Sequence, residues 1–299
     1  MNSLKYAFVL LVFAAIGFGA TKYVSPDSDG GVGSEADPMT LKEAFAECTA
    51  GNTYILAPGT YTRGADANDW IINNASTASE VVFESATGNA ADVILTSSEG
   101  VTDGYYGTIY VLASTNSVIL KFRNMTINPG TGAQSFYSLY LRSTGAGNVT
   151  TTFENCVIVG DVADARAVFC TASSTGRIDV TLTNCTLNIS GTSAGFYAST
   201  NALSNLTITG GTWTHSGTQN YLLMVPSVGT KCSISGVTFN TSSETTNVIN
   251  FTCAAASGLL SFHDNTITTT GNFNGWLFCA ANYWTNVRVY NNTLTITNN

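Results

Sequence analysis

The chain has 299 residues and a formal net charge of −8, and 44% of its residues are hydrophobic while only 10% are charged. This hydrophobic content excludes a disordered chain, and the abundance of Thr, Ser, Asn and Gly favours a β-rich extracellular protein. The acidic balance argues against nucleic acid as a partner, because phosphate binding requires clustered positive charge.

Residues 1–19 are predicted to be a signal peptide. Lys5 gives a short positive start, residues 6–18 form an apolar run, and Gly17, Gly19 and Ala20 suit nearby cleavage. The apolar run is short for a membrane span, although an uncleaved N-terminal anchor is the alternative. We therefore expect a secreted, extracellular protein with no membrane association after cleavage.

Residues 20–60 are predicted to form an N-terminal cap that contains one short helix. Thr40 and Glu43 have the spacing of a capping box. The apolar stripe at helical spacing consists of Leu41, Ala44, Phe45 and Cys48. Gly51 is expected to end the helix. A strand over residues 54–56 and a turn at Pro58-Gly59 then follow.

Residues 61–299 contain a repeat, which predicts stacked coils. Seven segments share one pattern. It starts with an apolar residue and any residue, continues with Asn, Gly or Asp, and has a large apolar residue three positions after the Asn, Gly or Asp. They begin at Phe122 (FRNMTI), Phe153 (FENCVI), Leu182 (LTNCTL), Ile208 (ITGGTW), Ile234 (ISGVTF), Phe262 (FHDNTI) and Val289 (VYNNTL), at spacings of 26 to 31 residues. A second strand-like segment precedes each by about ten residues, so each repeat holds three short strands.

One position of the repeat is restricted to three residue types. It holds Asn124, Asn155, Asn184, Gly210, Gly236, Asp264 and Asn291. A sharp bend between strands needs a left-handed residue, and Gly, Asn and Asp tolerate that conformation best. Repeated strands that alternate apolar and polar residues can bury their apolar side only by stacking, at ~4.8 Å per rung. The prediction is an all-β solenoid with three strands per coil.

These motifs resemble the right-handed parallel β-helix of the pectin-lyase-like superfamily, with its asparagine ladder at the tight turn. The segment TKYVSPDSDGGVGSEADPMTLKEAFAECTAGNTYILAPGTYT is similar to the opening of many secreted β-helix proteins, in which a helix caps the first coil. The resemblance covers residues 21–299. It is specific for the fold and weak for function, because one fold hosts many activities.

Seven cysteines are present, and an odd number cannot pair fully within one chain. Most fall at positions expected to face the interior, where Cys serves as a small hydrophobic residue. Cys156 and Cys185 occupy equivalent repeat positions and stack one rung apart in this arrangement. The sequence leaves open whether they form a disulfide.

The candidate site lies on the coils that carry most of the charge, between residues 121 and 179. Strand alternation places four aromatic residues in one outward column, which suits sugar rings: Tyr110, Tyr140, Phe169 and Tyr197. The resemblance implies that acidic residues there hold Ca²⁺ and that a basic residue acts as base or neutralises a uronate. The corresponding residues are Arg142, Asp161, Asp164 and Arg166. The alternative is structural: stacked rings that stabilise the sheet, and a solvated loop with a surface ion pair.

The sequence leaves catalysis open. It has no lyase signature to match residue by residue, and it lacks the two-Asp and Gly-His-Gly pattern of polygalacturonases. His215 and His263 are isolated, and His263, beside Asp264, is interpreted as a solvated outward side chain. If the protein is an enzyme, the resemblance implies a polysaccharide lyase or a glycoside hydrolase.

Two hypotheses follow, with a third behind them. The first is a secreted protein that binds, and in one version cleaves, extracellular polysaccharide or cell-surface glycan. The second is a non-catalytic structural or adhesive solenoid whose copies associate end to end through a C-terminal coil without a cap. The third is ice binding by the column of Thr126, Thr186, Thr212, Thr238, Thr266 and Thr293, although Thr suits outward strand positions in general.

Overall fold

The structure is a computed structural model. It describes residues 19–297 apart from 65–69, 74–78, 99–106, 131–136, 162–165, 174, 191–193, 200–202, 217–220, 243–246 and 271–275. It describes only the backbone of 73, 194, 226–230, 247, 252–257, 276–277, 279 and 281–283. The predicted signal peptide therefore lies almost wholly outside the described residues. No helix in the described part is long and apolar enough to cross a membrane.

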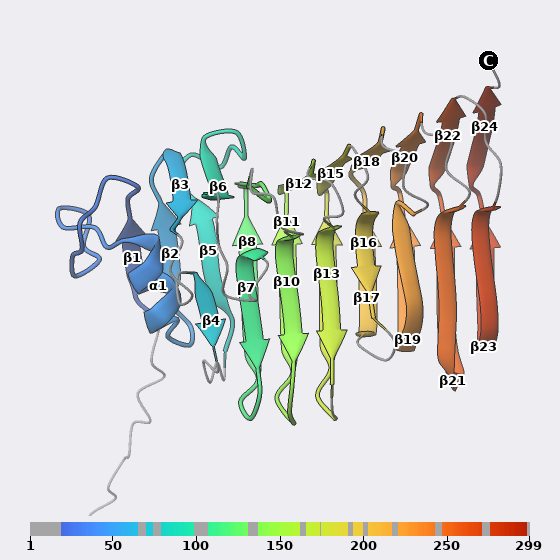
Figure 1. The fold of residues 1–299 in the computed structure, drawn as a ribbon, viewed down its shortest axis with the longest axis horizontal. Helices are drawn as coiled ribbons and strands as arrows, with labels where there is room; N and C mark the ends of the chain where they lie inside the picture. The colour runs from blue at the N-terminus through green and yellow to red at the C-terminus, as the bar shows by residue number, and fades with distance from the viewer. Residues whose placement is uncertain are drawn as a thin grey trace, which may run out of the picture.

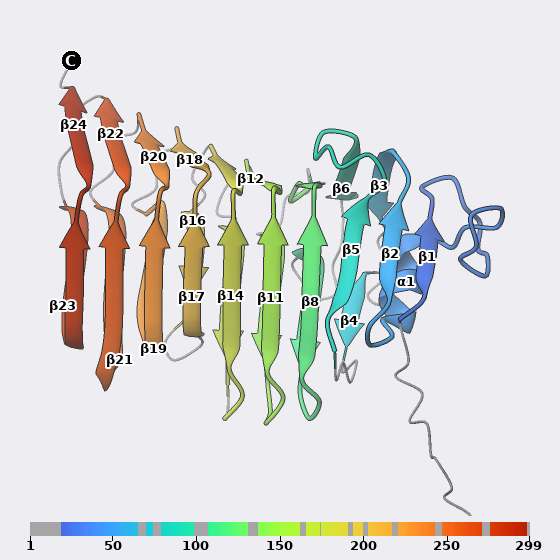
Figure 2. The ribbon, with the colours of Figure 1, turned by 180° about the vertical axis from the view of Figure 1, so that it is seen from behind.

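The chain winds as a right-handed parallel β-helix, as predicted (Figures 1 and 2). All strand pairs of the coils are parallel, and each strand pairs with its equivalents in the neighbouring coils. The first face of the coil contains β4 (Ile71–Asn73), β7 (Gly107–Ala113), β10 (Tyr137–Ser143), β13 (Arg166–Ala172) and β16 (Ala194–Ala198). The second face lies behind it and contains β1 (Thr21–Val24), β2 (Thr53–Leu56), β5 (Val81–Ser85), β8 (Val118–Arg123), β11 (Val149–Glu154), β14 (Ile178–Thr183) and β17 (Leu203–Thr209).

The third face is a separate sheet of short strands. It contains β3 (Gly59–Arg63), β6 (Val93–Ser97), β9 (Thr126–Ile127), β12 (Val157–Gly160), β15 (Thr186–Ile189), β18 (Thr212–His215), β20 (Thr238–Thr241), β22 (Thr266–Thr270) and β24 (Thr293–Thr297). In the last coils the first and second faces merge, because single long strands run through both. These strands are β19 (Leu223–Ser235), β21 (Asn247–His263) and β23 (Trp276–Tyr290).

The turn between the second and third faces has the predicted conformation. All seven residues of the restricted repeat position have positive φ, between 52° and 67°. Asn155 Nδ2 also donates to Asn124 Oδ1 at 3.1 Å, so these two neighbouring members of the column are hydrogen-bonded along the axis. The outward threonines of the third face are in register as well, from Thr186 through Thr212 and Thr238 to Thr266.

The interior is filled by stacked apolar side chains. Tyr54, Phe83, Phe122 and Phe153 form one buried stack, with successive ring centroids 4.8, 5.4 and 5.2 Å apart. The five cysteines whose side chains are described are buried free thiols, as the repeat predicts for most of them. Cys156 and Cys185 are among these five, so they are not joined by a disulfide in this structure.

Helix α1 (Leu41–Glu47) closes the N-terminal end of the coil (Figure 1). The capping box is present: Glu43 N donates to Thr40 Oγ1, and Thr40 N donates to Glu43 Oε2. The predicted apolar stripe is buried. The helix end was predicted wrongly, because Cys48, rather than Gly51, is the C-cap and takes a left-handed conformation with φ 30°.

Candidate functional site

The predicted aromatic column is present on the outer side of the first face. Tyr110, Tyr140, Phe169 and Tyr197 are register partners on β7, β10, β13 and β16. Their ring centroids follow one another at 4.9, 5.2 and 5.7 Å. Alternation along the strand places the rings outside, while their neighbours Leu139, Leu141 and Val168 fill the core.

The sequence predicts that Tyr110 lies at the surface, but the structure buries it. Its exposed fraction is 0%, and that of Tyr140 is 8%. The Tyr110 ring packs on Tyr140, and its hydroxyl lies 3.5 Å from Arg142 Nη1. A ligand on this face therefore cannot reach Tyr110 in the observed arrangement. The half-buried rings of Phe169 and Tyr197 are the accessible part of the column.

A fifth ring, Tyr137, joins the column, although strand alternation does not place it there. Its centroid lies 4.8 Å from Phe169 and 5.4 Å from Tyr140. Tyr137 begins β10, three residues before Tyr140, so strict alternation would assign it to the opposite side. We call Tyr137, Tyr140, Phe169 and Tyr197 together the aromatic surface.

Arg166 lies over the aromatic surface. Its guanidinium carbon is 3.9 Å from the Tyr197 centroid, 4.7 Å from that of Phe169 and 5.9 Å from that of Tyr137. A guanidinium held over ring faces is stabilised by cation–π attraction, and its N–H groups stay available at its edges. Arg166 makes no ion pair with a described residue, so the surface carries a positive charge that is held in place by rings.

The two acidic candidates, Asp161 and Asp164, make no described contact with the aromatic surface. Asp161 follows β12 and is exposed, while Asp164 lies outside the described residues. Among the described residues, no group of three or more His, Cys, Asp and Glu side chains could hold a metal ion. Ca²⁺ prefers six to eight oxygen ligands. Its binding at Asp161 and Asp164 therefore stays an expectation from the resemblance.

The charged residues of 121–179 are divided between two faces of the coil. Lys121, Arg123 and Glu154 lie on the second face, away from the aromatic surface. Lys121 and Arg123 both pair with Glu154, and Arg123 also pairs with Glu84. Lys121 Nζ is 2.6 Å from Glu154 Oε1, Arg123 Nε is 2.9 Å from Glu154 Oε2, and Arg123 Nη1 is 3.2 Å from Glu84 Oε2. Burial alone would raise the pKa of Glu154, but hydrogen bonds and charge from Lys121 and Arg123 outweigh it and lower that pKa.

Other polar side chains outside the aromatic surface also contact neighbours or are buried. Asn205 Nδ2 donates to Asp179 Oδ1 at 2.8 Å on the second face. His263 is not simply solvated as interpreted from the sequence: its Nδ1 lies 2.7 Å from Asp264 Oδ2, and its ring stacks on Tyr290 at 4.7 Å. His215 is buried. Of the predicted site residues, the structure brings together Arg142, Arg166 and the four aromatic residues.

Comparison with known proteins identifies a distant structural likeness. No protein-family model matches the chain, and no curated protein sequence matches it. Among solved structures, the chain is similar to one titled "Crystal structure of pectate lyase Pel9A", with 13% sequence identity and a TM-score of 0.36. The match covers 90% of this chain and 79% of that one. The parallel β-helix is established by the strand pairing of this chain itself, and a likeness at this level assigns no activity.

Proposed function

We propose that this chain is a secreted protein that binds extracellular polysaccharide on the aromatic surface. The observation that carries the proposal is the run of stacked rings from Tyr140 through Phe169 to Tyr197, which follows the coil axis. The faces of Phe169 and Tyr197 are covered by neighbouring rings and by Arg166, so sugar C–H groups would pack along the outer ring edges while sugar hydroxyls stay in water. Because each ring stands on a rigid strand, binding would order few additional side chains.

Arg166 and Arg142 supply the polar contacts of the proposed site. The Arg166 guanidinium lies over the rings, and its N–H groups can donate to sugar hydroxyls or to a carboxylate of the glycan. Among the described residues, no carboxylate or imidazole takes part in these ring and guanidinium contacts. The proposal is therefore for binding, and cleavage would require groups beyond these.

Removing either accessible ring is expected to weaken glycan binding. Phe169→Ala and Tyr197→Ala should each raise the dissociation constant about tenfold, since losing one ring contact costs on the order of 1.4 kcal/mol. Affinity electrophoresis of the native chain and the variants through gels containing neutral and acidic polysaccharides measures this. Tyr23→Ala, a half-buried tyrosine on β1, is the matched control and should migrate like the native chain.

The same panel decides against the proposal if the native chain is retarded by none of the polysaccharides. It also decides against it if Phe169→Ala and Tyr197→Ala are retarded as strongly as the native chain. New reducing ends or unsaturated products in the gel would show that the chain also cleaves the glycan it binds.

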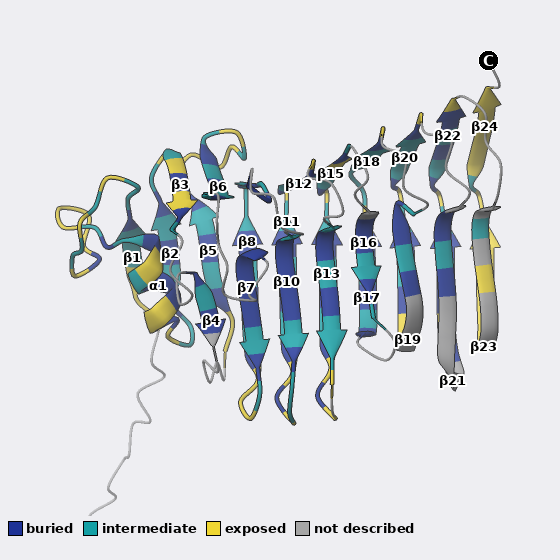
Figure 3. Cartoon of the chain, in the orientation of Figure 1, coloured by how far each residue is buried: buried dark blue, intermediate teal, exposed yellow. Residues whose placement is uncertain are grey.

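A second candidate function, a self-associating structural solenoid, is favoured by one observation on the last coil. Val287, Val289, Leu294 and Ile296 have exposed fractions of 48%, 49%, 53% and 49%. Figure 3 shows exposure along β24, beside the more buried β22. In the described residues β23 and β24 have a strand partner on one side only. Because α1 closes the opposite end, the occupant that fits is the same end of a second copy, in a two-fold arrangement.

Self-association through this end predicts a concentration-dependent dimer. Sedimentation velocity of the native chain should show a monomer–dimer equilibrium, and Val289→Asp with Leu294→Asp should shift it to monomer. Replacing the exposed Val32 with Asp in the N-terminal cap is the control and should leave the dimer intact. A native chain that stays monomeric at high concentration contradicts this function.

A further inference from the structure

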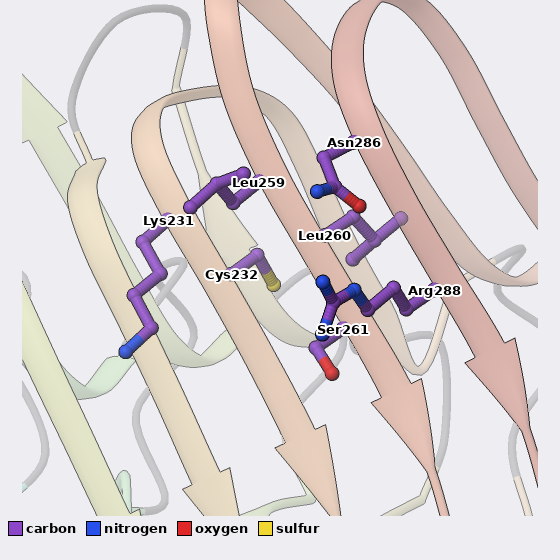
Figure 4. A pocket seen from close by; sticks show the side chains of 7 residues that line it. All are labelled: Lys231, Cys232, Leu259, Leu260, Ser261, Asn286 and Arg288. Carbon is purple, nitrogen blue, oxygen red and sulfur yellow. The ribbon is translucent and has the colours of Figure 1, made fainter.

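A hollow on the second face, near the C-terminal end, is distinct from the aromatic surface. It has a volume of about 220 Å³ and is formed by β19, β21 and β23 (Figure 4). Its outer lining is Lys231, Leu259, Ser261, Asn286 and Arg288. We call these five residues the basic groove.

The groove lies where the ladder of the sheet is irregular. Register shifts occur between Val228 and Lys231, between Cys253 and Gly258, and between Gly258 and Leu259. A bulge re-aims the side chains beside it and increases the local twist. The strands then align again, with Lys231, Leu259 and Asn286 as register partners across the groove. Ser261 and Arg288 are partners two residues further along.

The charge of the groove is uncompensated within the described residues. Lys231 and Arg288 are exposed, and neither forms an ion pair with a described side chain, unlike Lys121 and Arg123 at the other end of the same face. The described carboxylates nearest to the groove in sequence contact other residues. Asp264 lies beside His263, beyond the groove, and Asp179 accepts a hydrogen bond from Asn205, two strands before Lys231. The groove is thus a local positive region on a chain of net charge −8.

The side chains of the groove have the chemistry of an oxyanion site. Figure 4 shows Arg288 extending from β23 toward Ser261 on β21, while Lys231 stands at the opposite rim with its ammonium pointing away from both. The guanidinium fork matches carboxylate or sulfate oxygens in two-point contacts, and the Ser261 hydroxyl and the Asn286 amide add neutral donors. Leu259, which is 46% exposed, offers an apolar contact for the body of a ligand.

We propose that the basic groove binds an oxyanion, a sulfate or carboxylate group, present as a free ion or as a substituent on a sugar. Arg288 makes the principal contact, Ser261 and Asn286 orient the group, and Lys231 adds positive charge at the rim. This site does not depend on glycan binding at the aromatic surface, because the two lie on different faces of the coil.

Titration of the native chain with sodium sulfate, at ionic strength held constant with chloride, tests the proposal calorimetrically. Saturable binding is expected, with a dissociation constant on the order of millimolar or tighter. Arg288→Gln should weaken it about tenfold or more, and Arg288→Lys should weaken it less, because the charge stays while the fork is lost. Arg177→Gln removes the same charge from an exposed arginine of the second face, which contacts Ser204, and should leave binding unchanged.

A second titration with sulfated and unsulfated forms of one oligosaccharide distinguishes the two sources of the oxyanion. Sulfate binding alone indicates a free ion, whereas preference for the sulfated sugar indicates a substituent. Phe169→Ala should not change either result, which separates this site from the aromatic surface. The proposal is overturned if neither ligand binds saturably, or if Arg288→Gln binds both as the native chain does.

Discussion

Replacing Phe122 with alanine is expected to lower the free energy of unfolding by about 3–5 kcal/mol, the usual cost of truncating a buried aromatic residue. Phe122 is fully buried, and its ring stacks between Phe83 and Phe153 at 5.4 and 5.2 Å. Each ring in this stack belongs to a different coil. Truncation therefore removes packing between three successive coils and leaves a cavity that stiff parallel strands cannot close.

Guanidinium denaturation followed by circular dichroism measures this loss. Phe169→Ala is the matched control, since Phe169 is also a stacked phenylalanine but lies on the outer side, where it is only half-buried. Its loss should be about 1 kcal/mol, in the range of a surface ring pair. An equal effect of the two substitutions would contradict the assignment of inner and outer columns.

Replacing Asn265 with alanine is expected to cost about 2–4 kcal/mol, because buried backbone groups would lose their partners. Asn265 is 1% exposed and follows the left-handed Asp264. Its Oδ1 accepts from Val237 N at 2.9 Å, and its Nδ2 donates to Ile234 O at 3.2 Å and to Asn292 Oδ1 at 3.0 Å. One side chain thus satisfies backbone groups of the preceding coil and extends the ladder to the next.

Cysteine is the informative control at this position. Cys156 and Cys185 occupy the equivalent place in earlier coils, where their thiols donate to Phe122 O at 3.5 Å and to Phe153 O at 3.3 Å. Asn265→Cys should therefore lose less stability than Asn265→Ala in the same denaturation experiment. If both variants unfold at the native midpoint, the hydrogen bonds of the Asn265 side chain contribute nothing measurable to the free energy of unfolding.

The fold could be predicted from the sequence because one local constraint repeats. A left-handed residue is needed at each turn between the second and third faces, and only Gly, Asn and Asp meet that need at low cost. The positions of Asn124, Asn184 and Gly236 therefore identified the coils, and their positive φ values confirm it. The end of α1 was missed because Cys48 adopts a left-handed conformation that its residue type does not favour, with Gly51 available three residues later.

The candidate site was only partly predictable, for two physical reasons. Alternation indicates which side of a strand a residue faces but not how deeply its neighbours cover it, so the burial of Tyr110 was missed. Each coil also visits three faces within about 28 residues, so residues that are close in sequence separate in space. Lys121 and Glu154 belong to the second face, whereas Arg142 and Arg166 belong to the first.

The central claim, that the coils stack in register, is tested most directly by distances between spin labels at equivalent positions. Thr152, Ser233, Ser261 and Arg288 share one outward column of the second face, linked through Thr181 and Thr207. With one label at position 152, backbone distances to positions 233, 261 and 288 should be about 14, 19 and 24 Å, one rung of ~4.8 Å per step. Distances that do not rise in equal steps of this size would contradict the in-register coil, and the placement of both proposed sites with it.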